Sequence, residues 1–418
     1  MKTFIQERYD NALLLAIAYT GFCLMIAAYS PYIMGMEYTY DAVAAEVRGL
    51  SFFSMIFILA VAVFKVGDVC SSLFGFSVNT VFFLSVMVSS MFLVINYDAV
   101  IYDVFIMASM LIVLLIGTSV FFREKYIKIA FIVYTIVSLI VGIQTIIAYG
   151  VSFEISDVYL VSHKNSICVN WAVCAVGMMF FCVSGKKGFF SLIYLLLSII
   201  FLMLILMVRG RAAFVAAFLC IVYILIKIFT KFSPSKIIFF IFIGMLIIPA
   251  LILLVNYFGI GSFIFASFMQ GRVGTDLDTI SSGRMIMMYD NIQYIMNNPL
   301  FGSAYSVGDL EAGHMYILRV LVMFGLVGGL PFLIPYFYIM KYILNGMMSS
   351  HANAKLYIWE LGYYLAAILY IVSLFEPAFP LAPKTVTSVV YFMLGISIRG
   401  TLMHQSKKNM YGPNVSIG

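Results

Sequence analysis

Charged residues are scarce in this chain, and their scarcity excludes an ordinary soluble domain. Asp, Glu, Lys and Arg make up 10% of the 418 residues, whereas hydrophobic residues make up 64%. Soluble domains average about 25% charged and about 45–50% apolar residues. The apolar residues occur in runs of about 20, as membrane-spanning helices require, and not in the short alternating segments of a β-barrel. The composition predicts an all-α, polytopic transmembrane helical bundle.

The sequence also shows no cysteine pattern typical of disulfides and no recognisable signal peptide. None of the six cysteines falls in the long polar interruption at residues 256–320, which argues against a disulfide framework or a thiolate metal site there. We expect small packing residues instead. The first apolar run, at 11–29, is too long for a signal peptide and has no small-residue cleavage site behind it, so we expect a first span. The cysteines are Cys23, Cys70, Cys168, Cys174, Cys182 and Cys220.

About twelve apolar runs are long enough to cross a membrane. We expect membrane helices 1–9 within 1–255, a large, partly helical loop over 256–314, membrane helices 10–12 within 315–402, and a tail over 403–418 that is irregular from Lys407 onward. An even number of spans places both termini on one side. The predicted spans lie near 11–29, 50–66, 78–95, 99–122, 127–149, 166–183, 189–208, 212–229, 237–255, 315–340, 356–375 and 386–402.

The distribution of positive charge predicts the orientation of the bundle. If the N-terminus is cytoplasmic, sixteen of the 24 basic residues lie on the inner side, as the positive-inside rule expects. Both termini are then cytoplasmic and the large loop lies outside. The inner residues are Lys2, Arg8, Lys65, Arg123, Lys125, Lys128, Lys186, Lys187, Lys227, Lys231, Lys236, Lys341, Lys355, Arg399, Lys407 and Lys408.

The two sides differ in the type of basic residue as well as in number. Inner basic residues are mostly Lys, whereas six of the eight outer ones are Arg. Topology needs only positive charge, but the planar guanidinium binds phosphate and carboxylate groups bidentately. The outer arginines are therefore candidates for binding an anionic ligand. The outer residues are Arg48, Lys164, Arg209, Arg211, Arg272, Arg284, Arg319 and Lys384.

Arg209-Gly210-Arg211 is the sharpest outer cluster, because it forms a short turn between two apolar runs. We predict a phosphate site there; the alternative is a pair of arginines that extend toward lipid headgroups. The loop before the sixth span contributes His163 and Lys164, which either join this site or belong to an ordinary polar loop. Arg272 and Arg319 are further accessory candidates on the same side.

The large outer loop is predicted to contain two helical stretches. Residues 256–269 are apolar but broken by glycine, which suits a helix lying along the membrane surface. Ser282 is a plausible N-cap for a second helix, and Pro299 requires that helix to end just before it. Its apolar face is expected to be Met285, Met288, Tyr289, Ile292, Ile295 and Met296.

Arg284 falls in the first turn of this second helix, where the helix dipole disfavours a cation. The position is favourable if an anion binds there, held by free backbone N–H groups and the guanidinium; the alternative is an arginine in water. His314 precedes the tenth span. Imidazole titrates near neutral pH, so His314 is a candidate general base. Neither His351 nor His404, both on the inner side, is a candidate.

These motifs together resemble the O-antigen polymerase and O-antigen ligase superfamily of the bacterial inner membrane. The resemblance covers the many-span layout, the turn at 208–213, and Ser282-Gly283-Arg284 in the large outer loop. It extends to residues 298–302 (Asn-Pro-Leu-Phe-Gly), His314 and the glycine segment 325–328, whereas the N-terminal third is similar only in hydropathy. Two departures are Met315, where relatives often have Asn, and Val208, where they often have Ser.

The resemblance implies a glycosyltransferase whose active site is periplasmic. An acceptor hydroxyl would displace undecaprenyl pyrophosphate from a lipid-linked glycan in one inverting step, without a metal or cofactor. Arg209, Arg211 and Arg284 would bind the pyrophosphate, and His314 would deprotonate the hydroxyl. Asp276 and Asp278 match a metal-binding pair only in form. The implied partners are the lipid-linked donor and acceptor, membrane lipids, a chain-length regulator and a flippase, with no nucleic acid.

Three alternatives to a polymerase stay open. A ligase performs the same chemistry but transfers the glycan to lipid A-core, and no residue in this sequence separates the two. A transporter or flippase of lipid-linked sugars is a different class, which predicts interrupted helices and a polar path near mid-membrane. We identify neither in the sequence, which favours an enzyme, and the overall resemblance favours an O-antigen polymerase over a ligase. The third alternative is a non-enzymatic member of an envelope assembly complex.

Overall fold

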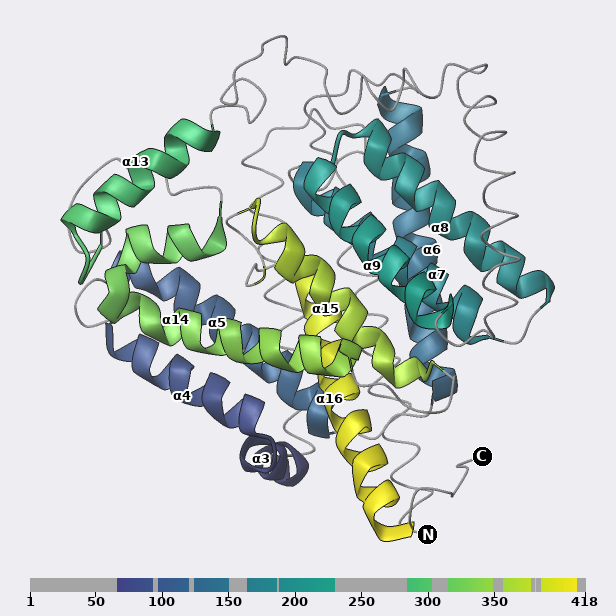
Figure 1. The fold of residues 1–418 in the computed structure, drawn as a ribbon, viewed down its shortest axis with the longest axis horizontal. Helices are drawn as coiled ribbons and strands as arrows, with labels where there is room; N and C mark the ends of the chain where they lie inside the picture. Colours follow the sequence, from purple (N-terminus) through teal and green to yellow (C-terminus); the bar gives the residue numbers. More distant parts are fainter. Residues whose placement is uncertain are drawn as a thin grey trace.

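The computed structural model describes a helical bundle (Figure 1). Residues 66–92, 97–119, 124–149, 164–185, 188–229, 284–302, 315–348, 356–376, 380 and 385–411 are described. Within these ranges there is no strand, which confirms an all-α helical bundle, and six helices are long and apolar enough to cross a membrane, which supports a membrane protein. The predicted spans at 11–29 and 237–255 lie outside the described residues, as does the span at 50–66 up to residue 65.

The helices follow the predicted apolar runs closely. The bounds are α3 Val66–Gly75, α4 Ser77–Met91, α5 Tyr97–Ser119, α6 Glu124–Tyr149, α7 Lys164–Ser184, α8 Phe189–Met207, α9 Arg211–Phe229, α13 Arg284–Asn297, α14 Tyr316–Met348, η2 Ile358–Glu360, α15 Leu361–Val372 and α16 Thr385–Tyr411. The short helix α3 was not predicted. The tail expectation was wrong in part, because α16 continues to Tyr411, where Gly412 and Pro413 follow in the sequence.

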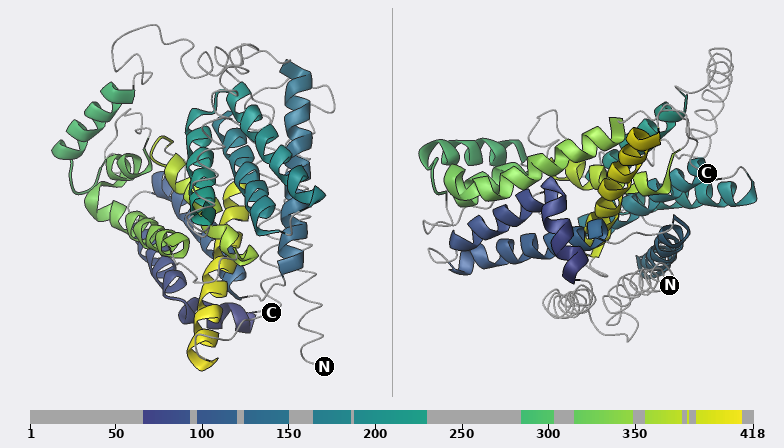
Figure 2. Two further views of the ribbon diagram at one scale, coloured as in Figure 1. Left: turned by 45° about the vertical axis from the view of Figure 1, so that its right-hand side comes forward. Right: turned by 90° about the horizontal axis from the view of Figure 1, so that it is seen from below.

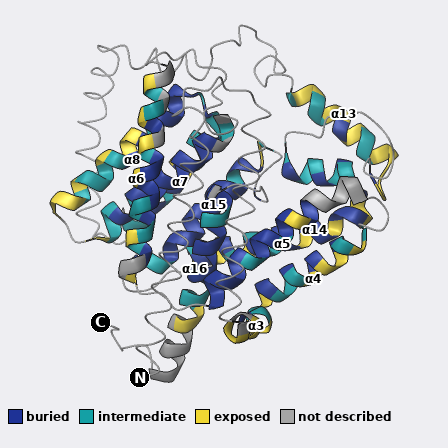
Figure 3. Ribbon diagram, turned by 180° about the vertical axis from the view of Figure 1, so that it is seen from behind, coloured by how far each residue is buried: buried dark blue, intermediate teal, exposed yellow. Residues whose placement is uncertain are grey.

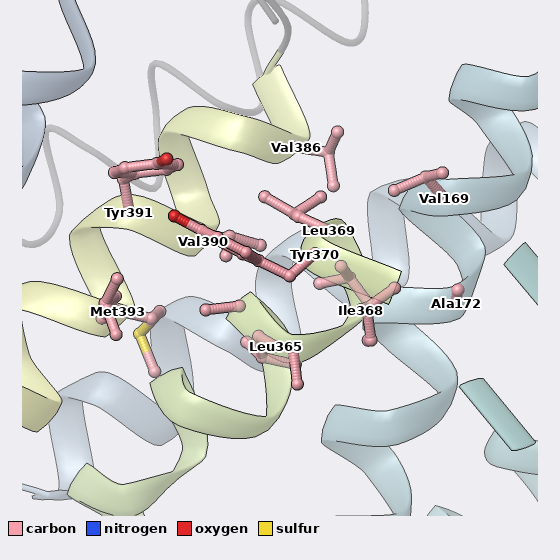
Figure 4. Packing of buried hydrophobic residues seen from close by; sticks show 14 of the residues in the cluster. Val169, Ala172, Leu365, Ile368, Leu369, Tyr370, Val386, Val390, Tyr391 and Met393 are labelled. Carbon is pink, nitrogen blue, oxygen red and sulfur yellow. The ribbon is translucent and has the colours of Figure 1, made fainter. Parts of the chain in front are cut away.

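Two groups of helices meet at a central pair. Helices α6, α7, α8 and α9 form one group, and α3, α4, α5 and α14 form the other (Figures 1 and 2). Helix α15 packs on α7, α9 and α14, and α16 packs on α5 and α15. Apolar side chains of α7, α15 and α16 fill the centre, including Ala172, Ile368 and Tyr391 (Figure 4).

Burial separates the interior helices from those at the periphery. In α7, 78% of the apolar window Ile167–Ser184 is buried, against 28% for α8 (Figure 3). Helix α8 instead exposes Leu192, Leu196, Ile199 and Met203, which repeat every three or four residues along one face. An exposed stripe of this kind on a long apolar helix is typical of contact with lipid.

Long-range polar contacts sort the helix ends into two groups. We use "the Lys227 end" for the end where α5 and α9 finish and α15 begins. Here Lys227 Nζ lies 3.7 Å from Glu360 Oε2, and Arg399 Nη1 donates to the carbonyl of Thr118 at 2.9 Å. The opposite end, which we call "the Arg284 end", contains the starts of α5, α7, α9, α13 and α14. This grouping matches the predicted alternation of spans; which end faces the cytoplasm stays a prediction.

Candidate functional site

The turn between α8 and α9 places two arginines at the Arg284 end. It consists of Val208, Arg209 and Gly210. The N–H of Arg209 donates to Leu206 O at 3.0 Å and that of Gly210 to Ile205 O at 2.9 Å, which is the Schellman ending of a helix. Arg209 takes the left-handed position, with φ of 58°. An L-residue there costs about 1–2 kcal/mol, so an arginine at a position that suits glycine is an outlier that suggests function.

Gly210 is required by the close approach of this turn to α7. A Cβ at position 210 would lie 2.4 Å from Sγ of Cys168. The carbonyl of Gly210 accepts from the N–H of Phe214 at 2.8 Å and so begins α9, with Arg211 as its first residue. The sequence left open which arginine matters. The structure gives them different settings, one in a strained turn and the other at a helix start.

Glu376 connects α7 to α13 at the same end. Its Oε1 accepts from Nδ2 of Asn165 at 2.8 Å and from Nη2 of Arg284 at 3.3 Å. Asn165 lies in the first turn of α7, three positions before Cys168. The two residues therefore share one face of the helix, and their Cβ atoms are about 5–6 Å apart. The turn with Arg209 and the start of α13 are therefore linked through one turn of α7 and one carboxylate.

Sequence reasoning missed Glu376. The residue is a lone carboxylate between apolar residues, Phe375 before it and Pro377 and Ala378 after it, in the segment that follows α15. An isolated acid in an apolar interhelical segment is costly unless it is paired, and this was the available signal. Its effect is to neutralise part of the charge of Arg284, whose side chain is 36% exposed.

Helix α13 spans Arg284–Asn297; Arg284 lies in its first turn and the helix ends just before Pro299, as the sequence predicted. The expected N-cap, Ser282, lies outside the described residues. The predicted apolar face is only partly right. Met288 and Ile295 are half-buried, but Met285, Tyr289, Ile292 and Met296 are exposed, and the one buried residue of the helix is Asn291.

Two segments that carried the family resemblance contact each other. Helix α14 is interrupted at Gly325, whose φ of 63° and ψ of −165° are not helical. The carbonyls of Pro299 and Leu300 accept from the N–H groups of Leu326 and Val327, at 2.8 and 3.0 Å. These N–H groups would otherwise lose their partners at the break, at a cost of several kcal/mol each in a membrane.

The contact between these segments requires two glycines. Gly302 also has a positive φ, 65°, and a Cβ on it would lie 2.5 Å from the backbone nitrogen of Gly325. A Cβ on Gly325 would lie 2.4 Å from the carbonyl of Leu300. We identified no interrupted helix in the sequence, so this break was missed. The sequence showed a glycine-containing segment but not the turn that completes its hydrogen bonding.

Arg319 has a structural partner. Its Nη2 donates to both carboxylate oxygens of Asp103, at 3.0 and 3.2 Å, with both side chains largely buried. This ion pair joins the starts of α14 and α5. Nearby, the N–H of Tyr316 donates to the carbonyl of Ser373 at 3.0 Å, which fixes α14 to the end of α15. Arg319 therefore contributes to packing, and its charge is balanced.

The side chains of three predicted site residues are not described. His314 and Arg272 lie outside the described residues. Lys164 begins α7, directly before Asn165, although its side chain is not described. Within the part of the chain that the structure describes, no group of three or more His, Cys, Asp or Glu side chains has the geometry to hold a metal ion.

Arg209, Arg211 and Arg284 thus lie at the starts of α9 and α13, and α7 connects the two through Cys168 and through Asn165, which binds Glu376. Free N–H groups and positive partial charge at helix starts favour anions, and the arginines add full charges. A comparison of the chain with models of known protein families found no match, and a comparison with curated proteins found none.

Proposed function

We propose that this chain is an O-antigen polymerase of the bacterial inner membrane, which joins undecaprenyl-pyrophosphate-linked repeat units at the periplasmic face. The observation that supports this best is the link through Glu376, Asn165 and Cys168 between Arg284 and the turn that contains Arg209. A pyrophosphate with two phosphoryl groups fits a site with more than one guanidinium better than a single-arginine site.

In this proposal the pyrophosphate of the donor binds between Arg284 and the Arg209–Arg211 turn. In the empty site the carboxylate of Glu376 pairs with the guanidinium of Arg284. When the pyrophosphate binds, it replaces Glu376 as the partner of that guanidinium. Both phosphate groups then accept hydrogen bonds from guanidiniums that the fold already holds in place. This arrangement stabilises the negative charge that develops as the leaving group departs.

The reaction is a single displacement at the anomeric carbon of the donor sugar. The hydroxyl oxygen of the acceptor glycan forms the new glycosidic bond as the bond to the pyrophosphate oxygen breaks, with inversion. His314 accepts the hydroxyl proton. His314 precedes Tyr316 by two residues, and the N–H of Tyr316 is bonded to Ser373, three residues before Glu376. The segment that follows His314 in the sequence thus contacts the segment that carries Glu376.

The transporter alternative receives one observation in its favour. Helix α14 is interrupted, as helices in many transporters are. In those proteins the broken backbone faces the substrate or ion. In this chain the N–H groups of Leu326 and Val327 donate to Pro299 and Leu300, so the break serves to hold the turn at 298–302. We therefore favour the enzyme.

The test is chain extension by purified protein in lipid vesicles. Given lipid-linked repeat units and no lipid A-core, the protein should produce a ladder of longer lipid-linked chains. Transfer that occurs only when lipid A-core is added would instead identify a ligase. Movement of the lipid-linked unit across the bilayer without extension would identify a transporter.

Matched variants connect the assay to the site. Arg284→Ala and His314→Ala should abolish the ladder while the protein still inserts and elutes as a folded species. Arg399→Ala and His404→Ala, both in α16 toward the Lys227 end, should extend chains normally per folded molecule. Full activity of both Arg284→Ala and His314→Ala would rule out the proposed site.

A further inference from the structure

Helix α13 has three distinct faces when its residues are placed at about 100° intervals. The first face packs on the protein and is centred on Asn291, which is 1% exposed. Arg284, Met288 and Ile295 flank it and are half-buried. Helix α14 is the neighbour that α13 contacts (Figure 1). This contact with protein covers about two fifths of the circumference of α13.

The remaining, exposed surface divides into an apolar and a mainly polar face. Met285, Tyr289, Ile292 and Met296 fall within about 60° of one another, and each is exposed, Tyr289 by 62% and Met296 by 69%. The polar face carries Asp290, Gln293 and Asn297, with Ile286 among them. A helix with protein, apolar and polar faces has the pattern of a helix at a lipid–water boundary.

The apolar face of α13 continues into a lipid-facing stripe of a candidate span. Leu300 and Phe301 follow α13 and are both exposed. The carbonyl of Leu300 is bonded to the N–H of Val327 in α14. From that point α14 exposes a stripe of large apolar side chains along one side of a helix that is long enough to cross the membrane. The stripe consists of Leu326, Val327, Leu330, Ile334 and Phe337.

We propose that α13 lies in the membrane interface at the Arg284 end, with Met285, Tyr289, Ile292 and Met296 inserted among the lipids of that leaflet. Lipid is the occupant that the structure favours, because the apolar face is continuous with the exposed apolar stripe of a helix long enough to cross a membrane. No charged side chain interrupts that face, whereas Asp290 lies on the adjacent polar one. The chain is thus anchored in the bilayer at α13.

This placement has a consequence for Arg284. As the first residue of an interfacial helix, it lies at the depth where lipid headgroup phosphates reside. That consequence bears on the proposed function, because a lipid-linked pyrophosphate occupies the same depth. The placement of α13 itself rests on exposure and packing alone, so it stands or falls separately from any catalytic activity.

Single tryptophans on the two exposed faces test the proposal. The chain has only two native tryptophans, Trp171 and Trp359, so the unmodified protein supplies the background to subtract. Tyr289→Trp places a probe on the apolar face and Gln293→Trp places one on the polar face. Leu330→Trp, on the exposed stripe of α14, is the reference for lipid contact. Each full-length variant is reconstituted in phosphatidylcholine vesicles, and its elution as a folded species is checked beforehand.

Two quenchers report the surroundings of each probe. We expect brominated phosphatidylcholine to quench Tyr289→Trp about as strongly as Leu330→Trp, with emission shifted to shorter wavelength, and aqueous iodide to have little effect. Gln293→Trp should show the reverse. Iodide quenching of Tyr289→Trp equal to that of Gln293→Trp would place α13 in water. Quenching of Tyr289→Trp by neither agent would mean that protein covers the face. Lipid quenching of both probes would show that both exposed faces contact lipid, so that the helix lies inside the bilayer and not at its surface. Each of these three results overturns the proposal.

Discussion

Two basic residues at each end of the bundle stand in opposite relations to the helix dipoles. At the Lys227 end, Lys227 lies in the last turn of α9, and Arg399 donates to a carbonyl in the last turn of α5. Cations at helix C-termini stabilise the helices that end there. At the Arg284 end, Arg211 and Arg284 are the first residues of α9 and α13, where the dipole is already positive.

Basic residues at helix ends stabilise the fold, whereas those at helix starts are favourable only when an anion binds to them. The arginines at helix starts are less favourable for folding than those at helix ends, and Arg209 adds backbone strain. Glu376 offsets this for Arg284 in the empty site. An anion-binding site needs positive charges, and those at helix starts contribute least to the stability of the fold. The following variants test this contrast between the two ends.

Loss of the Asp103–Arg319 ion pair should have the largest effect on stability. Arg319→Ala leaves a largely buried carboxylate without its partner, which costs about 3–5 kcal/mol. Replacing both residues by Leu should recover most of the loss, because no charge is then stranded. Thermal unfolding in detergent measures both. If the folded double variant still extends chains, Arg319 acts only in packing. If that variant is folded but inactive, Arg319 belongs to the functional site.

Gly325→Ala should be nearly as damaging. The new Cβ would overlap the carbonyl of Leu300 at 2.4 Å, and φ of 63° is unfavourable for alanine, so we expect a loss of about 3 kcal/mol. Gly75→Ala, in α3 near the Lys227 end, is the matched control because a Cβ there meets open space. Unfolding of the two variants at the same temperature would contradict the contact between α14 and the turn at 298–302.

Glu376→Gln and Glu360→Gln compare the acids at the two ends. Removal of the Glu376 charge should strengthen pyrophosphate binding to Arg284 by about 1 kcal/mol at this partly exposed pair, which is roughly a fivefold lower KM. Glu360→Gln should leave KM unchanged. Steady-state chain extension at varied donor concentration provides the measurement. An increased KM for Glu376→Gln would show that Glu376 positions Arg284 and does not compete for it.

Arg209→Gly should have the smallest effect on stability, and of opposite sign. Glycine accepts φ of 58° without strain, so the variant should be more stable by about 1 kcal/mol or somewhat less. Chain extension should nevertheless fall, since a guanidinium is lost from the site. A variant that is both more stable and fully active would leave the strain at Arg209 without a functional reason.

The parts of the structure that the sequence predicted depend on local signals. The turn at 208–210 follows from two charged residues between apolar runs, and the end of α13 follows from Pro299. The order of the described spans follows from their apolar length. Each of these features is set by neighbours within about one or two helical turns, so a pattern along the chain was enough to place them.

The parts that the sequence missed depend on distant partners. Glu376 acquires its role from Asn165 and Arg284, which are far away in the chain. Gly325 interrupts α14 because the turn at 298–302 supplies the missing acceptors, and nothing in the glycine-containing segment indicates this. The apolar face of α13 was only partly predicted, because the position of α14 decides which of its residues contact protein.

The central claim is that Arg211 and Arg284 bind one and the same pyrophosphate. A double-mutant cycle on binding of undecaprenyl pyrophosphate to the purified protein tests it most directly, with Arg211→Ala, Arg284→Ala, their combination, and Arg399→Ala as the control. We expect each single variant to bind more weakly, the pair to lose clearly less than the sum of the single losses, and the control to bind as the parent does. Losses that add independently, or single variants that bind normally, would contradict the claim.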